Sequence, residues 1–270
     1  MEADDKPSLD EYSQKLQAEA PPGALYTSAK YYTSYLNGLT EEIKSGYFNQ
    51  LMRALVESKS EYVQPEMLFL GGPADIELLH KPLNSVLDKI YRNNVLFNRS
   101  WPNDPKTKLS LSNFHLSLED LFRSRIICRY MDGPKFACES LKSFCDRKGI
   151  SSYFRNVTTN LGYHAWHFYY TQPVEDFGGN GPADLKVEVQ FTTQLAEVIS
   201  ALTHIQYEKT RLGRRPDPGW EWDVKSDQFK PYYLGHGLHL LEGVILEYRN
   251  DVVETGAPSN QDVETKEPDQ

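Results

Sequence analysis

The sequence predicts an α/β or α+β domain in which a mixed β-sheet is flanked by helices. Apolar residues recur at three- and four-residue spacing near both ends of the chain, which is typical of helices, whereas shorter segments in the middle alternate as strands do. The resulting order of helix, strand, helix, three strands and helix indicates packed layers that contain hairpins. A chain of 270 residues is long enough to bury a core of its own.

The predicted helices occupy both ends of the chain and the connections of the sheet. They run over 24–60, 75–92, 135–148, 193–211 and 232–248. Within the first of them, Gly38 favours a break, and Thr40 is a candidate N-cap for the part that follows. The sheet is therefore expected to be framed by helical N- and C-terminal extensions.

The predicted strands run over 125–130, 153–159, 164–171 and 185–192. In the last of these, alternation places Val187 and Val189 on one side and Glu188 and Gln190 on the other. Two interpretations of that polar side stay open. It is either a solvated strand face or a carboxylate that projects into a cleft.

Composition limits the class of protein. The formal net charge of -9 argues against general nucleic-acid binding through a basic surface. The three cysteines fall in one short segment without a Cys-x-x-Cys pair, which favours neither a disulfide framework nor a zinc site. With no signal segment and no apolar run of membrane length, we expect a soluble, cytoplasmic protein.

The expected organisation is one domain between two tails. We predict a disordered leader over 1–23, a single domain over 24–249 with its core at about 75–211, and a disordered acidic tail over 250–270.

Several segments offer side chains suited to phosphate or nucleotide binding. Lys81, Ser85 and Lys89 are spaced to line one face of a helix, which can grip a phosphate chain or be ordinary solvated surface. Asp120 stands at the entrance of a strand with Arg123 and Arg125 just behind it, a pattern that can seat a metal and a polyphosphate or form a surface ion cluster.

A glycine turn leads an aromatic residue and histidines into the next strand. In Gly162-Tyr163-His164-Ala165-Trp166-His167, an exposed tyrosine can stack on a base. The alternative is a buried aromatic residue at a strand end.

The order of these motifs resembles the synthetase domain of the RelA/SpoT family. Lys-x-x-x-Ser-x-x-x-Lys is followed by Asp before a strand, then Gly-Tyr-x-x-x-His, then Val-Glu-Val-Gln and a helix that contains His204. The resemblance covers roughly 81–211. It implies a nucleotidyltransferase-like fold and ATP-dependent transfer of pyrophosphate to the 3′-hydroxyl of a purine nucleotide, which makes (p)ppGpp or an adenine analogue.

The resemblance also implies roles for individual residues. Asp120 and Glu188 would hold Mg²⁺ and activate the acceptor hydroxyl. The ATP phosphates would be contacted by Lys81, Ser85, Lys89 and Arg125, with Arg123 as a further cation. The acceptor would be contacted by Tyr163, His167, Gln190 and His204.

The chain departs from the family pattern at several cationic positions. Leu79 stands where the family usually has an arginine, Thr192 replaces another, and His164 replaces a third. These losses leave a catalytically inactive nucleotide-binding module as one alternative. A second alternative is a toxin-like enzyme that modifies the 3′ end of tRNA, for which Arg211, Arg214 and Arg215 are a candidate patch.

The implied partners are ATP together with GDP, GTP or tRNA as acceptor, and no membrane. A homo-oligomer is left open and, for a toxin, so is an antitoxin.

The last predicted helix has two interpretations. His236, His239 and Glu242 suggest a metal site. An apolar stripe at helical spacing instead favours a helix that packs, and it consists of Leu234, Leu238, Leu241, Ile245 and Tyr248. We favour the packing helix.

Overall fold

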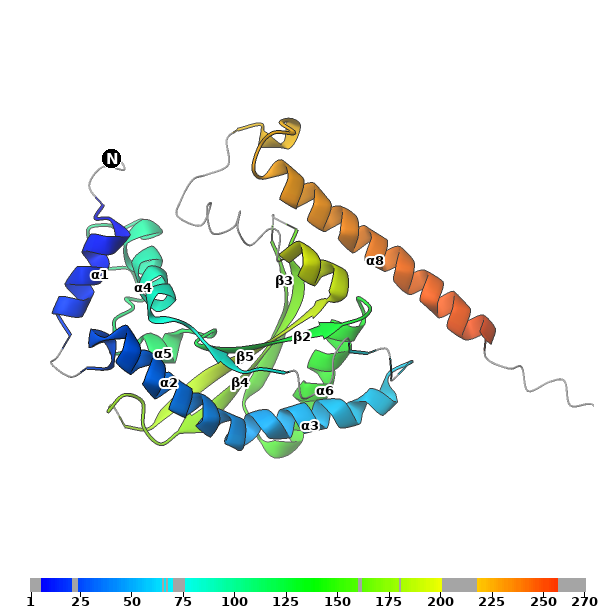
Figure 1. Cartoon of the computed structure of the whole chain (residues 1–270), viewed down its shortest axis with the longest axis horizontal. Helices are drawn as coiled ribbons and strands as arrows, with labels where there is room; N and C mark the ends of the chain where they lie inside the picture. The colour runs from blue at the N-terminus through cyan, green and yellow to red at the C-terminus, as the bar shows by residue number, and fades with distance from the viewer. Residues whose placement is uncertain are drawn as a thin grey trace, which may run out of the picture.

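The protein is built on one five-stranded mixed sheet (Figure 1). The computed structural model describes residues 6–20, 24–64, 66, 68–69, 76–159, 162–179, 181–200 and 218–256. In chain order the strands are β1 (Leu79–His80), β2 (Phe122–Cys128), β3 (Ser152–Thr158), β4 (His164–Val174) and β5 (Ala183–Thr193). Their order in the sheet is β1-β2-β5-β4-β3, with β2 and β5 parallel and the other pairs antiparallel. The predicted fold class is thus confirmed.

One face of the sheet forms the hydrophobic core. Alternate residues of β4 and β5, such as Phe168 and Val189, are fully buried there. Helix α6 (Gly133–Lys148) packs across β2 to β5. It begins with Pro134 in its first turn and ends at Gly149, whose φ of 70° supplies the left-handed cap. The single long crossover between parallel β2 and β5 includes this helix and the β3–β4 hairpin.

The first helical region bends later than expected. Helices α2 (Ala29–Ile43) and α3 (Asn49–Glu57) are joined by a π-helical turn at 44–48, in which Gly46 has a ψ of -120°. The prediction of Thr40 as an N-cap is wrong, because Thr40 lies buried inside α2 and its hydroxyl donates to Leu36 O at 2.7 Å. At Gly46 a Cβ would lie 2.7 Å from the Gln172 amide, so the bend brings this backbone close to β4.

The second predicted helix begins eight residues later than expected. Helix α4 covers Leu83–Tyr91 and continues as a π-helical turn at 92–96. Pro82 excludes the residue before it from the α region and caps the helix with extended backbone. Lys81 therefore precedes the helix and does not share a helical face with Ser85 and Lys89.

The expected leader contains a helix. Helix α1 (Leu9–Ala18) begins with a capping box between Ser8 and Glu11 and packs on α4. Tyr91 donates its hydroxyl to Pro7 O at 3.0 Å, which joins the start of α1 to α4. The prediction of disorder is wrong for these residues, because a satisfied helix start and a packing partner compensate for a polar sequence. Residues 1–5 and 21–23 lie outside the described part of the chain.

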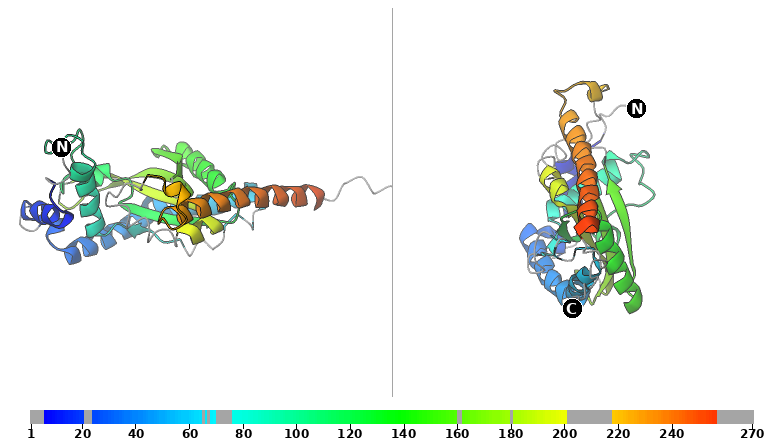
Figure 2. Two further views of the ribbon diagram at one scale, coloured as in Figure 1. Left: turned by 90° about the horizontal axis from the view of Figure 1, so that it is seen from above. Right: turned by 90° about the vertical axis from the view of Figure 1, so that its right-hand side faces the viewer.

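A long helix, α8 (Phe229–Gly256), ends the described chain, so the predicted tail is helical as far as residue 256. It runs along the margin of the protein, and its C-terminal end extends beyond the sheet (Figures 1 and 2). Residues 194–200 are also helical. The shorter elements are helix α5 (Phe114–Ser117) and three 3-10 turns at Leu25–Thr27, Ser58–Glu61 and Trp220–Trp222. Among the helices described, none combines the length and the apolar character that a membrane span requires.

Candidate functional site

The sheet face opposite the core carries two rows of polar side chains. Because alternate residues of a strand share a face, the strand register aligns these side chains across neighbouring strands. One row consists of Arg125, Gln190, His167 and Arg155. The other consists of Arg123, Glu188, Tyr169 and Tyr153, and the apolar Leu79 lies at its β1 end. Residues that are far apart in sequence thus form one surface.

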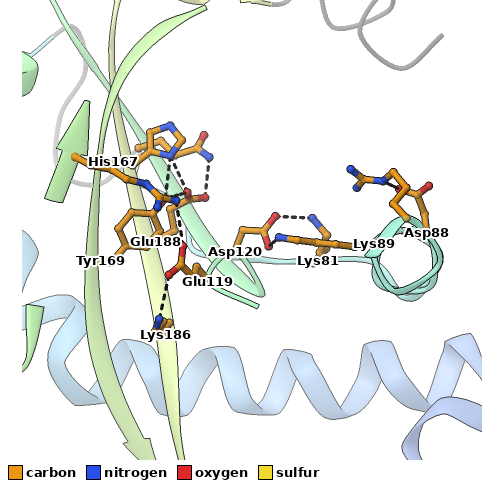
Figure 3. Close-up of polar contacts among 12 residues, drawn as sticks. Lys81, Asp88, Lys89, Glu119, Asp120, His167, Tyr169, Lys186 and Glu188 are labelled. Atoms are coloured by element: carbon orange, nitrogen blue, oxygen red, sulfur yellow. Dashed lines mark hydrogen bonds and ion pairs between the residues drawn. The ribbon is translucent and has the colours of Figure 1, made fainter. Parts of the chain in front are cut away.

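Glu188 is the centre of this surface. It is 3% exposed, and its carboxylate accepts hydrogen bonds from three side chains (Figure 3). Oε1 lies 2.8 Å from both the Tyr169 hydroxyl and His167 Nδ1, and Oε2 accepts from Gln190 Nε2 at 2.8 Å. The interpretation of this strand face as solvated is therefore wrong, since Glu188 and Gln190 are both buried.

These donors keep Glu188 ionised. Burial alone would raise the pKa of the carboxyl, but the bonds from His167, Tyr169 and Gln190 outweigh burial and lower it. A buried carboxylate without such donors would be costly, so the donors are what make its position tenable. The result is a fixed negative charge on a face that is otherwise rich in cations.

Tyr163 extends the network toward the start of β4. Its hydroxyl lies 3.0 Å from His167 Nε2, while Nδ1 of the same ring faces Glu188. A His167 tautomer with the proton on Nδ1 satisfies both contacts, because Nε2 then accepts from Tyr163. Burial raises the pKa of Tyr163 to about 12, so its hydroxyl stays protonated as this donor. The Tyr163 side chain is half-buried, so it is neither the exposed tyrosine nor the fully buried aromatic residue that the sequence left open.

Asp120 forms a second cluster with two lysines. Its Oδ2 lies 2.6 Å from Lys81 Nζ and its Oδ1 lies 2.7 Å from Lys89 Nζ. Burial would raise the pKa of Asp120, but the two ammonium groups hold it well below its usual range. For Lys81, desolvation outweighs the attraction of Asp120 and lowers the pKa. The predicted lysines thus converge on the predicted aspartate (Figure 3).

The Asp120 cluster lies just before β2, and β2 pairs with β5, the strand that carries Glu188. Arg123, directly opposite Glu188 on parallel β2, follows Asp120 by three residues. Arg123 is exposed, and no hydrogen bond of its side chain is recorded among the described residues. Arg125 contacts Gln190 Oε1 at 3.3 Å and pairs with Glu197 at 2.9 Å.

A third group of polar side chains lies beside Glu188, and the sequence analysis did not identify it. Glu119 accepts from the Tyr153 hydroxyl at 2.5 Å, from Arg155 at 3.0 Å and from Lys186 at 3.0 Å. Arg155 also donates to the Tyr169 hydroxyl at 3.1 Å, which links this group to the Glu188 network. The alternation of Tyr153 with Arg155 was the available signal, but only strand pairing shows which face they share.

The remaining predicted residues are placed as follows. Ser85 is half-buried on α4, one turn before Lys89. His204, Arg211, Arg214 and Arg215 lie outside the described residues. On α8, His236 and His239 meet His164, with a His239–His164 ring separation of 3.8 Å, and Glu242 meets Thr193.

The carboxylates suit a metal that also takes ligands from a substrate. Within the described ranges, no three His, Cys, Asp or Glu side chains are arranged to hold a metal by themselves. Mg²⁺ in phosphoryl-transfer sites uses one or two carboxylates and completes its shell with phosphate oxygens and water. Asp120 and Glu188 both have lowered pKa values and are ionised, so their carboxylate oxygens fit that donor set. The histidines and Glu242 of α8 do not form the metal site considered from the sequence.

Comparison with known proteins gives matches by structure alone. No protein-family profile matches this chain, and no curated protein sequence matches it significantly. The crystal structure of small alarmone synthetase 1 from Bacillus subtilis bound to its product pppGpp matches with a TM-score of 0.55 and 18% identity, over 83% of this chain and 98% of that one.

A second solved structure, a GTP pyrophosphokinase family protein from Streptococcus pneumoniae, matches with a TM-score of 0.53 and 17% identity. The match covers 80% of this chain and 95% of the other. At such identities the likeness concerns the fold. The chain therefore has the fold of the small alarmone synthetases.

Proposed function

We propose that the protein is an ATP-dependent pyrophosphokinase that transfers the β,γ-pyrophosphate of ATP to the 3′-hydroxyl of a purine nucleotide. The observation that carries the proposal is the buried, ionised Glu188, held by three donors beside the Asp120–lysine cluster. The fold of the small alarmone synthetases and the order of the four motifs support it. Perturbed titratable groups gathered on one face are typical of functional sites.

The lysines supply positive charge for the polyphosphate of ATP. An ammonium group has three N–H donors, so Lys81 and Lys89 can each contact Asp120 and still donate to phosphate oxygens. Phosphoryl transfer depends mainly on positioning and on neutralising charge. Arg125, anchored by Glu197 and Gln190, adds a cation on β2.

Arg123 offers a replacement for one missing family cation. Leu79 stands where the family usually has an arginine, and Arg123 is its direct cross-strand partner. Opposed Cβ atoms in an antiparallel pair are about 5 Å apart. The guanidinium of Arg123 can therefore reach nearly the same space as an arginine at position 79 would. This compensation supports an active enzyme over an inactive binding module.

The acceptor side consists of Tyr163 and the Glu188 network. The Tyr163 ring can stack on a purine, since its hydroxyl is tied to His167 and its ring is half-buried. Glu188, ionised at neutral pH, can accept the proton of the attacking hydroxyl. Gln190 and His167 fix the orientation of that carboxylate.

Asp120 and Glu188 would hold Mg²⁺, which supplies charge neutralisation at the phosphates. Lys81 and Lys89 keep Asp120 ionised, as a metal ligand must be.

Transfer of label tests the proposal directly. The purified protein is incubated with γ-labelled ATP, Mg²⁺ and, separately, GDP, GTP, AMP, ADP or bulk tRNA. Label on a nucleotide together with an equal amount of AMP is expected, because pyrophosphate transfer leaves AMP whereas hydrolysis leaves ADP. Label on tRNA alone would support the toxin alternative. No transfer to any acceptor, with nucleotide binding retained, would refute the enzyme and support the binding module.

A further inference from the structure

Helix α8 turns a polar face toward the protein. The inward residues recur at turn spacing and are Gly235, His239, Glu242 and Arg249. Their partners lie at strand ends and in loops and are Gly162, His164, Thr193 and Asp132. The apolar stripe faces outward, where Leu234, Leu241, Ile245 and Tyr248 are 45% to 71% exposed. The sequence-based expectation that this stripe packs on the body is therefore wrong.

Two of these contacts lie on either side of Tyr163, in residues 162–164, which we call the acceptor turn. On one side, a Cβ on Gly235 would lie 2.6 Å from Gly162, so the helix and the turn meet backbone to backbone. On the other side, the His164 ring stacks on the His239 ring at a centroid separation of 3.8 Å and an interplanar angle of 4°. The backbone of Tyr163 is thus held between two contacts with α8.

The side chains of Tyr163 and His164 have different partners. Tyr163 directs its hydroxyl to His167, in the network around Glu188, whereas His164 contacts α8. His164 stands where the family that the sequence resembles usually has an arginine. In this chain, the residue at that position binds the helix through a flat ring instead of carrying a guanidinium.

A glycine turn needs contacts outside itself to keep one conformation. Gly162 has a φ of 77°, in a region that glycine enters and leaves at low cost. The amides of Gly162 and Tyr163 both donate to Thr159, at 3.0 Å and 3.3 Å, which ties the turn to the residue after β3. The contacts with α8 tie it to a second, separate element.

Helix α8 is itself anchored away from the turn. Glu242 accepts a hydrogen bond from the hydroxyl of Thr193, at the end of β5. Two turns further along, Arg249 pairs with Asp132 at 2.8 Å, and its guanidinium lies 4.7 Å from the centre of the Tyr130 ring. Glu242 and Arg249 are both buried, so these bonds are shielded from water and fix the helix along its length.

We propose that α8 positions the acceptor tyrosine. Gly235 and His239 are positioning residues that hold the acceptor turn in the conformation in which the Tyr163 ring receives the purine. The inference rests on the proposed function for the role of Tyr163. A ring that is held in place beforehand loses little conformational freedom when the purine binds, so affinity is gained without a further contact. The proposed ATP contacts come from other segments, at 81–89 and on β2.

Two alanine substitutions on α8 test the positioning. Gly235→Ala inserts a methyl group where the backbone of Gly162 lies, whereas a methyl group at Gly237 would meet nothing within 4 Å. Both substitutions raise the helix propensity alike, so they differ in the contact alone. We expect Gly235→Ala to raise the KM for the acceptor roughly tenfold and to leave the KM for ATP within about twofold of wild type. Gly237→Ala should leave both KM values unchanged.

Hydrogen exchange separates this inference from the proposed function. The amides of Gly162 and Tyr163 donate to Thr159, so their exchange reports the order of the turn without any substrate. Gly235→Ala should quicken their exchange roughly tenfold, while amides 166–170 within β4 keep their wild-type rates. If this pattern is found in a protein that transfers no label, the proposed function fails and the coupling of α8 to the turn stands.

Substitution of His239 tests the second contact without adding volume. His239→Ala removes the ring that stacks on His164 and should also raise the KM for the acceptor and quicken exchange of the turn. His239→Phe keeps a flat ring and should restore both quantities to near wild type. Equal increases in the KM values for ATP and for the acceptor would mean a general structural effect and would overturn the proposal. Exchange of the turn that neither Gly235→Ala nor His239→Ala alters would overturn it as well.

Discussion

Glu188→Gln is the substitution that tests the site most directly. It keeps the size of the side chain and removes its negative charge. Oε1 can still accept from Tyr169 and His167, but the new amide nitrogen would face Gln190 Nε2, which now donates at 2.8 Å. Two donors cannot bond each other. Turning the Gln190 amide would relieve the conflict but would direct its nitrogen toward Arg125, which now donates to its oxygen at 3.3 Å.

The magnitude follows from these contacts. Each charge-assisted hydrogen bond that is lost costs about 1.5–3 kcal/mol, whereas removing a buried charge recovers part of that amount. We therefore expect the free energy of unfolding to change by less than ~2 kcal/mol. Activity should fall far more, by at least ~10³-fold, because a proton acceptor and a metal ligand are lost together.

The assay measures both quantities on the same samples. Initial rates of pyrophosphate transfer are compared with urea unfolding for wild type, Glu188→Gln and Glu139→Gln. The last variant makes the same chemical change at an exposed position of α6, and its transfer rate should stay within twofold of wild type. A Glu188→Gln rate within tenfold of wild type would refute the role of Glu188. A large loss of both rate and stability would mean that the residue is structural.

Three further perturbations have defined outcomes. For Asp120, whose pKa is lowered on folding, the stability gained over Asp120→Asn should be full at neutral pH and should decline once the pH falls below ~4, where the unfolded carboxyl begins to bind protons; a gap that persists unchanged down to pH 2 would contradict this. Tyr163→Ala should raise the KM for the acceptor roughly tenfold or more with little change in ATP affinity, and Tyr163→Phe should keep the stacking and stay close to wild type; equal weakening of both substrates would remove the stacking role. Burial, followed by the neighbouring His239 and His236, lowers the pKa of His164 to about 4, so protonation disfavours its packing against α8. Hydrogen exchange of α8 amides should therefore quicken as the pH falls from ~6.5 to about 4, after correction for intrinsic rates. Within the described ranges, Glu242 is the carboxylate that pairs with this histidine group, through His239. His164→Gln should remove the pH dependence.

The elements with strong local signals were predictable from the sequence. Strand β5 alternates cleanly, and α6 has a proline at its start and a glycine at its end, so both were placed within two residues. Strand β1 has two residues and no periodicity of its own, and it exists because β2 lies beside it. Helix α1 was missed because its polar sequence needs the surface of α4 to be stable.

The candidate site was predicted as a set of residues and not as an arrangement. The order of motifs, through its resemblance to the RelA/SpoT family, singled out Asp120, Glu188 and the two lysines as candidates, because a motif depends on residue type and spacing. That Lys81 and Lys89 converge on Asp120 could not be read from helical spacing, since Pro82 takes Lys81 out of the helix. The group around Glu119 appears only when β3, β4 and β5 are paired.

The sequence by itself determined the α/β class, the chemistry of the candidate residues and the amphipathic character of the last helix. Tertiary structure alone decided the register that aligns Arg123 with Leu79 and Glu188, and the direction in which α8 faces. Periodicity shows that a helix has two faces, but specific partners decide which one turns inward. Here Glu242 and Arg249 find Thr193 and Asp132, so the polar face is held against the body and the apolar face is left outside.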